Sequence, residues 1–406
     1  WGSIVAIAGR ERGTFVYTNV HVLDILRQQQ GLNFPPGDQY NYSNSNYNLL
    51  AMIVERASGQ TLAQYTKENI FQPLGMKNTQ WRDDYRKIVK NRAVSYDRYG
   101  DRYYQSMPFE NAHGNGGMLT TTEDLLKWHR HYKNGRIGGK PFLDLQLQQG
   151  KLNNGSTLAY AGGVFIRNYR EVQEISHGGL TAGYRAWLAY YPKEDISVAF
   201  LSNDGEANPE KVGGQVAQII LGKRLITPIP KTISLSQRKL RAYLGRYKSL
   251  RNDELFELEL KEGGLHLKGY QTMLATSPYT FHWGASRMEF SKDLQRVLVY
   301  TGNGDSATFV RKTPTRLPLP ALPQYLGSYQ STEAETTIQL EMWENQLMGY
   351  QRPDVYYLLE SIYEDAFVNT KNQLFQFRRD SSQVITGFTL STPRAQGIWF
   401  ARLPQK

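Results

Sequence analysis

Apolar residues recur at helical spacing in the first third of the chain. One stripe lies within residues 22–26, before Gly31. A second stripe, which ends before Gly59, consists of Tyr47, Leu50, Ile53, Val54 and Ala57. Glycine readily adopts the left-handed conformation that ends a helix, so the pattern predicts a buried helix that stops at Gly59.

Two further helices are marked by their first residues. Thr61 and Thr121 each stand three positions before an amide or acidic side chain, which is the spacing of a capping box. The first of these helices is expected to stop before Pro73, because proline interrupts the backbone hydrogen bonds of a helix. The second is expected to run to Gly135.

From residue 159 to 203 the apolar period changes to two, and turn residues recur at 168–170 and 192–195. This pattern predicts an antiparallel meander of strands. The run Ile175-Ser-His-Gly-Gly-Leu180 stands at the end of the second strand. Adjacent glycines there allow another backbone to approach closely. A helix over 209–221 follows and closes this part of the chain.

The C-terminal part of the chain repeats itself. Leu240-Arg-Ala-Tyr-Leu-Gly-Arg-Tyr-Lys-Ser249 aligns with Leu322-Pro-Gln-Tyr-Leu-Gly-Ser-Tyr-Gln-Ser331. Further matches are Gly269-Tyr270 with Gly349-Tyr350, and Phe290, Asp293 and Val297 with Phe377, Asp380 and Val384. Each copy contains short alternating strands, which predict a small antiparallel barrel or sandwich.

Two proline-rich stretches, 227–230 and 314–323, separate these regions. Proline stiffens a linker and few contacts are expected to cross it. The predicted domains are therefore residues 1–224, 239–312 and 321–404, and residues 239–406 are expected to fold without the first domain.

Composition excludes several classes of function. The chain of 406 residues has no cysteine, so disulfides, thiolate metal sites and thiol catalysis are absent. The net charge of +11 is spread along the chain and mixed with acids, which argues against nucleic acid as a partner. His129 and His131 stand two apart on a predicted helix and face different directions, so neither a metal site nor a cofactor is expected. No apolar run is long enough for a membrane helix.

The stretch Asn33 to Gly59 carries the candidate chemistry. Two prolines and Gly37 predict a sharp turn, and the second apolar stripe predicts the helix beyond it. Tyr42-Ser43-Asn44 therefore lies on a loop held between a rigid turn and a helix. The plainer interpretation is a polar turn in which Ser45 or Asn44 caps the helix.

The wider pattern PPGxxYxYSNxxYxLL, followed by IVExxSGQ and by Phe71-Gln-Pro-Leu-Gly-Met76, resembles the serine β-lactamase and penicillin-binding-protein family, in particular its class C-like esterases and peptidases. The resemblance implies an α/β domain with an antiparallel sheet flanked by helices. It implies that Tyr42 is the general base or its proton partner and that Asn44 binds the substrate. His177-Gly178-Gly179 matches the family's third motif.

Further roles follow from the same resemblance. The backbone N–H of Leu180 would form half of an oxyanion hole, and Gly178 and Gly179 would bind substrate beside it. The loop from His113 to Gly117 would line the floor of the site. The two C-terminal copies resemble the lipocalin-like modules of some D-aminopeptidase-like enzymes. The substrate would be a small ester or peptide-like molecule, and the family is commonly exported to the periplasm or secreted.

One family motif, Ser-x-x-Lys, is missing. Only Ser236 is followed by a lysine three residues on, and it lies downstream of every other motif. The N-terminal part of the domain is therefore expected to be missing, and residues 1–406 alone are expected to have no acyl-transfer activity. Strand 196–202 would then keep an open edge. The alternative is a non-catalytic protein that binds peptide or cell wall in the same groove.

The residue type at position 177 predicts specificity. The family's β-lactamases and transpeptidases usually carry a lysine there, which is cationic at neutral pH and anchors a substrate carboxylate. A histidine with an ordinary pKa of about 6.5 is mostly neutral. β-Lactams are therefore expected to be poorer substrates than small esters or D-amino-acid amides.

Overall fold

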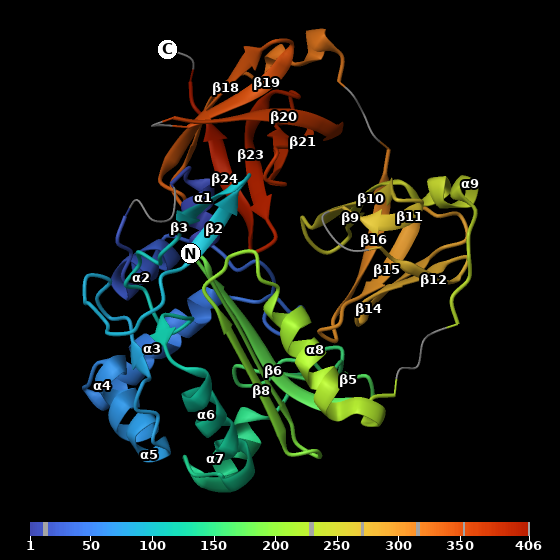
Figure 1. Cartoon of the computed structure of the whole chain (residues 1–406). Helices are drawn as coiled ribbons and strands as arrows, with labels where there is room; N and C mark the ends of the chain where they lie inside the picture. The colour runs from blue at the N-terminus through green and yellow to red at the C-terminus, as the bar shows by residue number, and fades with distance from the viewer. Residues whose placement is uncertain (11–14, 227–230, 269–271, 314–316, 352–353, 405–406) are drawn as a thin grey trace.

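The structure is a computed structural model that describes residues 1–10, 15–226, 231–268, 272–313, 317–351 and 354–404. It consists of an N-terminal domain with helices around a sheet and of two C-terminal β modules (Figure 1). The predicted class, an antiparallel sheet flanked by helices and followed by two small antiparallel barrels, is confirmed. Among the described residues no helix is both long and apolar enough to cross a membrane.

A four-stranded antiparallel sheet organises the N-terminal domain. Its strands pair in chain order: β5 (Phe165–Tyr169), β6 (Val172–Thr181), β7 (Tyr184–Tyr191) and β8 (Ile196–Ser202). Helix α8 (Pro209–Leu221), which was predicted over these residues, packs on β7 and β8 (Figure 1). Gly213 permits this approach, because a Cβ there would lie 2.1 Å from the Trp187 ring. Among the described residues β8 pairs with β7 alone, so its outer edge is open as expected.

Helices and short strands fill the rest of the domain. They are α1 (Gly2–Ile7), α2 (Asn19–Arg27), α3 (Asn44–Ser58), α4 (Leu62–Thr66), the π-helix η1 (Lys67–Phe71), α5 (Gln72–Leu74), α6 (Thr122–Asn134), α7 (Gly139–Gln146) and η2 (Gly222–Arg224), with the strand pairs β1 (Gln80–Trp81) and β4 (Met118–Leu119), and β2 (Tyr96–Tyr99) and β3 (Arg102–Gln105).

The predicted helix caps are confirmed. The Thr61 side chain accepts the N–H of Gln64 at 3.2 Å, and that of Thr121 accepts the N–H of Asp124 at 3.3 Å. Gly135 ends α6 in the left-handed conformation with φ of 59°. The predicted stop before Pro73 is wrong, because η1 and α5 continue the helical path to Leu74. Pro73 stands in the first turn of α5, the part of a helix in which proline is best tolerated.

The apolar stripe predicted as the buried face of α3 is also wrong in part. Leu50 and Ile53 are 50% and 59% exposed, whereas the buried residues of the helix are Ser45, Asn48 and Ala51. The buried face is polar because Asn48 organises a hydrogen-bond network with neighbouring loops. Its amide donates to Asn19 Oδ1 at 3.1 Å and to the His113 carbonyl at 3.0 Å.

Each C-terminal module is an eight-stranded antiparallel sheet, and the second is a closed barrel. The first contains α9 (Gln237–Leu240), η3 (Arg241–Tyr243), β9 (Gly245–Ser249), β10 (Leu255–Lys261), β11 (Gly264–Leu267), β12 (Leu274–Ser277), β13 (Thr280–Trp283), β14 (Ser286–Phe290), β15 (Arg296–Tyr300) and β16 (Ser306–Lys312). The second contains η4 (Leu319–Ala321), η5 (Pro323–Tyr325), β17 (Gly327–Ser331), β18 (Thr336–Trp343), β19 (Gln346–Gln351), β20 (Val355–Tyr363), β21 (Ala366–Val368), β22 (Leu374–Arg379), β23 (Ile385–Thr392) and β24 (Ala395–Arg402).

The repeat detected in the sequence extends to core geometry. Tyr243 meets the Phe290 ring edge-on at 5.0 Å, and Tyr325 meets Phe377 in the same way at 4.8 Å. One predicted equivalence is wrong. Val297 is fully buried but its proposed counterpart Val384 is 54% exposed, because the turn before β23 places Ile385 in the core instead. The matched Gly269-Tyr270 pair lies outside the described residues.

The expectation that few contacts join the modules to the first domain is wrong. Helix α1 packs into the core of the second module through Ile4 and Ile7. Gln351 of β19 donates to the Ile7 carbonyl at 2.9 Å. The two modules also meet each other, through the Arg246–Glu360 ion pair at 3.0 Å. The predicted linker at 227–230, and residues 314–316 of the other, lie outside the described residues.

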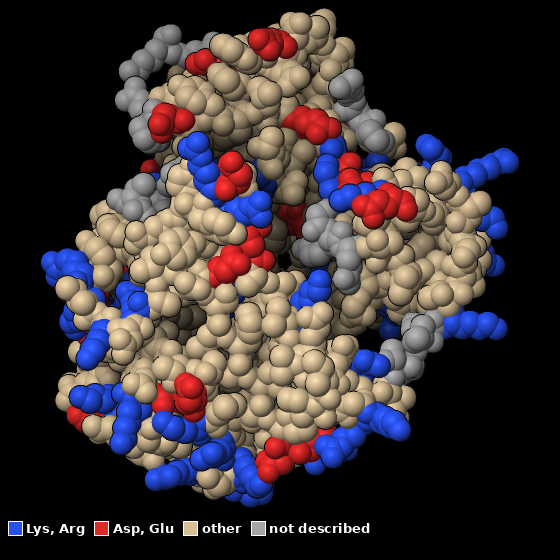
Figure 2. Space-filling view, viewed as in Figure 1, with Lys and Arg blue, Asp and Glu red and all other residues tan. Residues whose placement is uncertain are grey.

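Lys and Arg side chains are scattered over the visible face, with Asp and Glu among them (Figure 2). This distribution agrees with the mixed charge pattern of the sequence.

The α1 contact predicts a stability effect. Ile7 is 1% exposed, so Ile7→Ala should leave a cavity at the interface and lower the free energy of unfolding by about 2–5 kcal/mol. Ile219 is 83% exposed, and Ile219→Ala should change it by less than about 0.5 kcal/mol. Urea denaturation of residues 1–406 followed by tryptophan fluorescence measures both. Equal effects of the two substitutions would show that α1 does not stabilise the barrel.

Candidate functional site

All seven residues that the sequence singled out line one cavity of about 2060 Å³. They are Tyr42, Asn44, Gly117, His177, Gly178, Gly179 and Leu180. The cavity lies between the end of β6, the start of α3 and the loop before β4. The structure thus brings together residues more than a hundred positions apart, and their chemical roles remain predictions.

Tyr42 and His177 are neighbours in the wall of this cavity, with ring centroids 6.0 Å apart. The imidazole Nδ1 lies 2.6 Å from the Gly178 carbonyl oxygen, which can only accept, so Nδ1 carries the proton. Nε2 then accepts from the Tyr160 hydroxyl at 3.3 Å. Burial lowers the pKa of His177, and the Arg167 charge lowers it further against the effect of the Gly178 bond. The ring is therefore neutral at pH 7.

Tyr42 belongs to a cluster of aromatic side chains. Tyr160 meets the Tyr42 ring edge-on at 6.1 Å, and Phe165 lies 5.6 Å from His177. Burial raises the pKa of the Tyr42 phenol, and the nearby Arg394 charge only partly opposes that effect. Tyr42 is therefore a protonated phenol at neutral pH in this arrangement.

The end of β6 presents a free edge to the cavity. Pairing between β5 and β6 stops at Phe165 and Ser176, so residues 177–181 pair with β7 alone among the described strands. The Leu180 side chain is 73% exposed. An edge of this kind offers backbone N–H and C=O groups to an extended chain laid along it.

Asn44 is the first residue of α3, and the cap residue is Ser43. The plainer interpretation, in which Ser45 or Asn44 caps the helix, is therefore wrong. No described residue forms a hydrogen bond with the Asn44 side chain, which lines the cavity. The Asn44 amide is available to a ligand.

The loop from His113 to Gly117 lies against α3 on the other side of the cavity. Gly114, at φ of 110°, is needed because a Cβ there would lie 2.5 Å from the Tyr47 carbonyl oxygen. Asn48 donates to the Asn115 side chain at 2.9 Å. The Gly117 carbonyl accepts the N–H of Arg82 at 2.8 Å and fixes the end of the loop.

Both C-terminal modules reach this site, which sequence reasoning missed. Asn303, between β15 and β16, accepts from Arg167 at 2.7 Å, and its carbonyl accepts the N–H of Ala159 at 2.9 Å. Arg394, between β23 and β24, places its guanidinium carbon 5.2 Å from the Tyr42 ring centroid. Asn303 and Arg394 both line the cavity.

The first module also holds the backbone just before Tyr42. The Asp305 carboxylate is 4% exposed and accepts the N–H of Tyr40 at 3.0 Å. Arg251 pairs with both of its oxygens, at 3.0 and 2.7 Å. Asn252 donates to Gln39 at 2.9 Å. A bidentate pair of this kind fixes the carboxylate, and through it the start of the Tyr42 loop.

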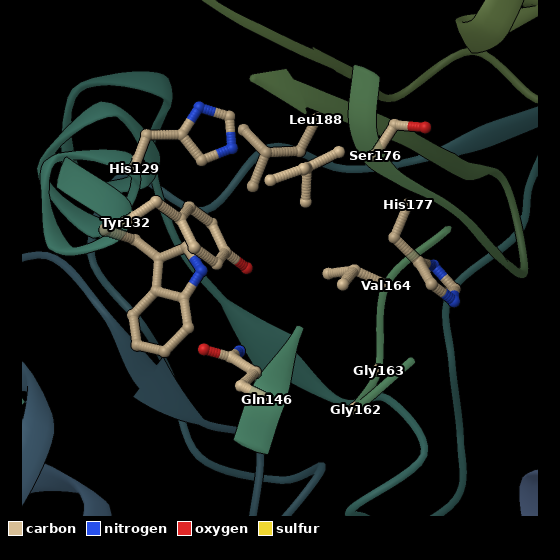
Figure 3. Close-up of a pocket in the computed structure, with 11 residues that line it drawn as sticks. His129, Tyr132, Gln146, Gly162, Gly163, Val164, Ser176, His177 and Leu188 are labelled. Atoms are coloured by element: carbon tan, nitrogen blue, oxygen red, sulfur yellow. The ribbon is translucent and has the colours of Figure 1, made fainter. Parts of the chain in front are cut away.

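A second, smaller cavity of about 200 Å³ lies behind His177, between α6 and β6 (Figure 3). His129 and Tyr132 line it from α6, and β6 lines it at Ile175, Ser176 and His177, with the Ser176 hydroxyl directed away from His129 and Tyr132 (Figure 3). His129 Nδ1 is buried and has no hydrogen-bond partner among the described residues. His131 is also buried, but its Nδ1 accepts the N–H of Ile137 at 3.1 Å. Within the described parts of the chain, no three His, Cys, Asp or Glu side chains lie close enough together to hold a metal ion.

Comparisons with known proteins point to one family. A family model described as Beta-lactamase matches residues 17–221. Protein flp of Staphylococcus aureus strain MW2 is 29% identical over 220 residues, which cover 52% of this chain and 43% of flp. Penicillin-binding protein 4* of Bacillus subtilis strain 168 is 28% identical over 215 residues, 47% of this chain and 46% of that protein. The chain thus spans less than half the length of these curated relatives.

Solved structures with a similar fold include the octameric penicillin-binding protein homologue from Pyrococcus abyssi, with 18% identity, 93% of this chain and 72% of that chain covered, and a TM-score of 0.48. A D-amino acid amidase from Ochrobactrum anthropi SV3, complexed with L-phenylalanine, has 21% identity, covers 52% and 65% of the two chains and has a TM-score of 0.45.

The hydrogen bond between the Tyr40 N–H and the Asp305 carboxylate predicts a local effect on stability and amide exchange. Asp305→Asn keeps the shape of the side chain but leaves the Arg251 charge without its partner, so stability should fall by about 1–3 kcal/mol. Amide exchange of Tyr40 and its neighbours should become faster, because the acceptor for the Tyr40 N–H weakens. Asp380→Asn, in a turn of the second module, is the control. Unchanged amide exchange around Tyr40 in the Asp305→Asn variant would show that Asp305 does not hold the backbone before Tyr42.

Burial of His129 predicts a pH dependence of stability. Its exposure is 2%, and burial lowers the pKa to about 4 from the ordinary 6.5. Above pH 6.5 the imidazole is neutral in both states and has no effect. As the pH falls from 6.5 to 4 the unfolded chain takes up the proton first, so the folded state loses about 3 kcal/mol.

The test is urea denaturation between pH 4 and 7. His129→Gln should flatten this part of the profile, whereas His282→Gln, a substitution in the first module, should not. An unaltered profile in His129→Gln would mean that the ring titrates normally.

Proposed function

Because the chain belongs to the beta-lactamase family, we propose that it carries the tyrosine and histidine sides of an acyl-transfer site that hydrolyses a small ester or amide. The observation that carries the proposal is the convergence of Tyr42, Asn44 and the β6 edge on one cavity. The family is one of serine hydrolases of the β-lactamase and penicillin-binding-protein type. The substrate and the residue roles belong to this proposal.

Each group has a role that its geometry allows. Tyr42 receives or relays the proton of the nucleophile, and the free Asn44 amide holds the substrate. The backbone N–H of Leu180 stabilises the oxyanion together with the N–H of the nucleophile. Residues 177–181 pair with the extended substrate, and the adjacent glycines at 178 and 179 let it approach the strand.

The proposal takes the nucleophile from outside residues 1–406. Ser236 is the only serine followed three residues later by lysine, and its side chain caps α9 of the first module by accepting the Lys239 N–H. Tyr42 also needs a cation to lower its pKa, and burial dominates over the Arg394 charge. The lysine of a Ser-x-x-Lys element would supply the additional positive charge.

A second candidate is a protein that binds peptide or cell-wall polymer without cleaving it. The specific observation in its favour is that residues 1–406 contain a complete strand edge for a peptide but no Ser-x-x-Lys element upstream of Tyr42. Such a protein would use residues 177–181 in the same way and would need no nucleophile.

Covalent labelling tests the proposal. Residues 1–406 incubated with a fluorophosphonate should show no mass increase, because no serine is activated. A chain extended upstream to include an in-frame Ser-x-x-Lys element should gain one adduct on that serine. A stoichiometric adduct on residues 1–406 would show that the nucleophilic serine lies within these residues, contrary to the proposal. The absence of an adduct on the extended chain would favour the binding protein that does not cleave its ligand.

Substrate preference provides the finer test in the extended chain. Because the imidazole of His177 is neutral, nitrocefin should be turned over much more slowly than a small ester or a D-amino-acid amide. His177→Lys should raise nitrocefin turnover relative to ester turnover, since it places a cation on β6, at the position where the family's β-lactamases anchor the β-lactam carboxylate. Rapid nitrocefin turnover by the unsubstituted chain, comparable with its esterase rate, would contradict the assigned preference.

A further inference from the structure

The turn between β23 and β24 brings a charged side chain of the second module to the catalytic loop. Asn41 donates to the Pro393 carbonyl at 2.8 Å, and Asn33 donates to the Arg394 carbonyl at 3.1 Å. The backbone N–H of Gln396 donates a hydrogen bond to Asn33 Oδ1 at 3.1 Å. Three hydrogen bonds therefore fix the backbone on both sides of the Arg394 side chain.

The Arg394 guanidinium lies 5.2 Å from the Tyr42 ring centroid and lines the cavity. No carboxylate of the described residues is within ion-pair distance of it. Two of the other arginines in the modules have such partners: Arg379 pairs with Asp365 at 2.7 Å, and Arg251 with Asp305 at 2.7 Å. Arg394 thus presents an unneutralised charge from a fixed backbone.

The surroundings of Arg394 strengthen this distinction. Arg167, a second guanidinium of the cavity wall, donates to the neutral Asn303 amide, and its buried Nε has no partner among the described residues. The aspartates that line the cavity already have cations: Asp83 pairs with Lys87 at 2.8 Å and Asp84 with Arg86 at 2.9 Å. Arg167 also lies near the Glu210 and Glu174 charges, so Arg394 is the guanidinium beside Tyr42 that has no nearby carboxylate among the described residues.

A solvated arginine stacked on a tyrosine is the plainer explanation, since such a contact alone contributes about 0.5–1 kcal/mol at an exposed site. It accounts for the stacking. It does not account for the hydrogen bonds that hold the turn against Asn33 and Asn41, nor for the second guanidinium with a free buried donor.

We propose that Arg394 binds a carboxylate of the substrate, so that the second module selects anionic peptide-like substrates for the site on the first domain. The inference rests on the proposed function of the cavity. A guanidinium presents two parallel N–H donors that match a carboxylate, and Tyr42 holds it in place by stacking. Arg394 places its charge beside Tyr42 rather than on β6, so it would bind a carboxylate at a different point of the substrate from a lysine at position 177.

Binding to residues 1–406 tests the inference without any turnover. N-acetyl-D-phenylalanine and N-acetyl-D-phenylalaninamide differ only in the charge of the terminal group. Isothermal titration calorimetry at pH 7 should give a dissociation constant about tenfold lower for the acid than for the amide, as a charge-assisted bond predicts. Arg394→Gln should abolish this ratio, because it weakens the binding of the acid far more than that of the amide.

Two further variants make the assignment specific. Arg394→Lys should keep part of the preference, because lysine retains the charge but not the paired donors. Arg378→Gln removes an exposed arginine of the same module and should change neither affinity.

The outcomes separate the inference from the function on which it rests. Equal affinity for acid and amide, or a preference that survives Arg394→Gln, would show that Arg394 does not bind the carboxylate. Binding of either ligand would still support the proposed cavity beside residues 177–181. Failure of both ligands to bind, in residues 1–406 and in an upstream-extended chain, contradicts the groove itself and the inference with it.

Discussion

The loop from Asn33 to Ser43 has no regular secondary structure, so its backbone and side-chain polar groups need partners from elsewhere. A buried polar group without a partner costs about 1–3 kcal/mol, and several such groups would unfold the loop. The partners come from both C-terminal modules: Asp305 accepts from Tyr40, and the turn at Pro393 accepts from Asn41. The placement of Tyr42 therefore depends on residues more than 250 positions away in the sequence.

This dependence explains why the modules are packed against the first domain. In a site built on a loop, the position of the catalytic side chain is only as precise as its supports. The first module supplies a buried carboxylate held by Arg251, and the second supplies a hairpin turn. The neutral pair of Tyr42 and His177 is thereby held in a largely aromatic wall, beside the Tyr160 and Phe165 rings.

Much of the fold and part of the site can be predicted from the sequence. Local signals were reliable: the Thr61 and Thr121 caps and the turn residues of the meander each have a physical cause within a few neighbouring positions. The tandem repeat was detected by comparing two distant segments of the chain. The family pattern located Tyr42, Asn44 and His177. The predicted burial of Leu50 and Ile53 failed because helical spacing shows which residues share a face but not which face is covered.

The contributions of Asn303, Asp305 and Arg394 could not be predicted for a related reason. Each lies in a short polar turn between two strands, where the same residue types usually face solvent. What makes them part of the site is the docking of one folded unit on another, which leaves no periodicity or motif in the sequence. Tyr160 and Phe165 carried a weak signal, since they flank a pair of glycines close to the β6 motif.

The seating of α1 in the second barrel has a consequence for how the chain is made. Ile7 and Gln351, which are bonded to each other, are separated by 344 residues. At about 5–20 residues per second, a ribosome needs on the order of 20–70 s to synthesise the chain between them. Throughout that time the apolar side chains of α1 have no second module to pack against. They are therefore accessible to chaperones and to premature association with other chains. The packing around α1 can therefore be completed only after the second module has been synthesised.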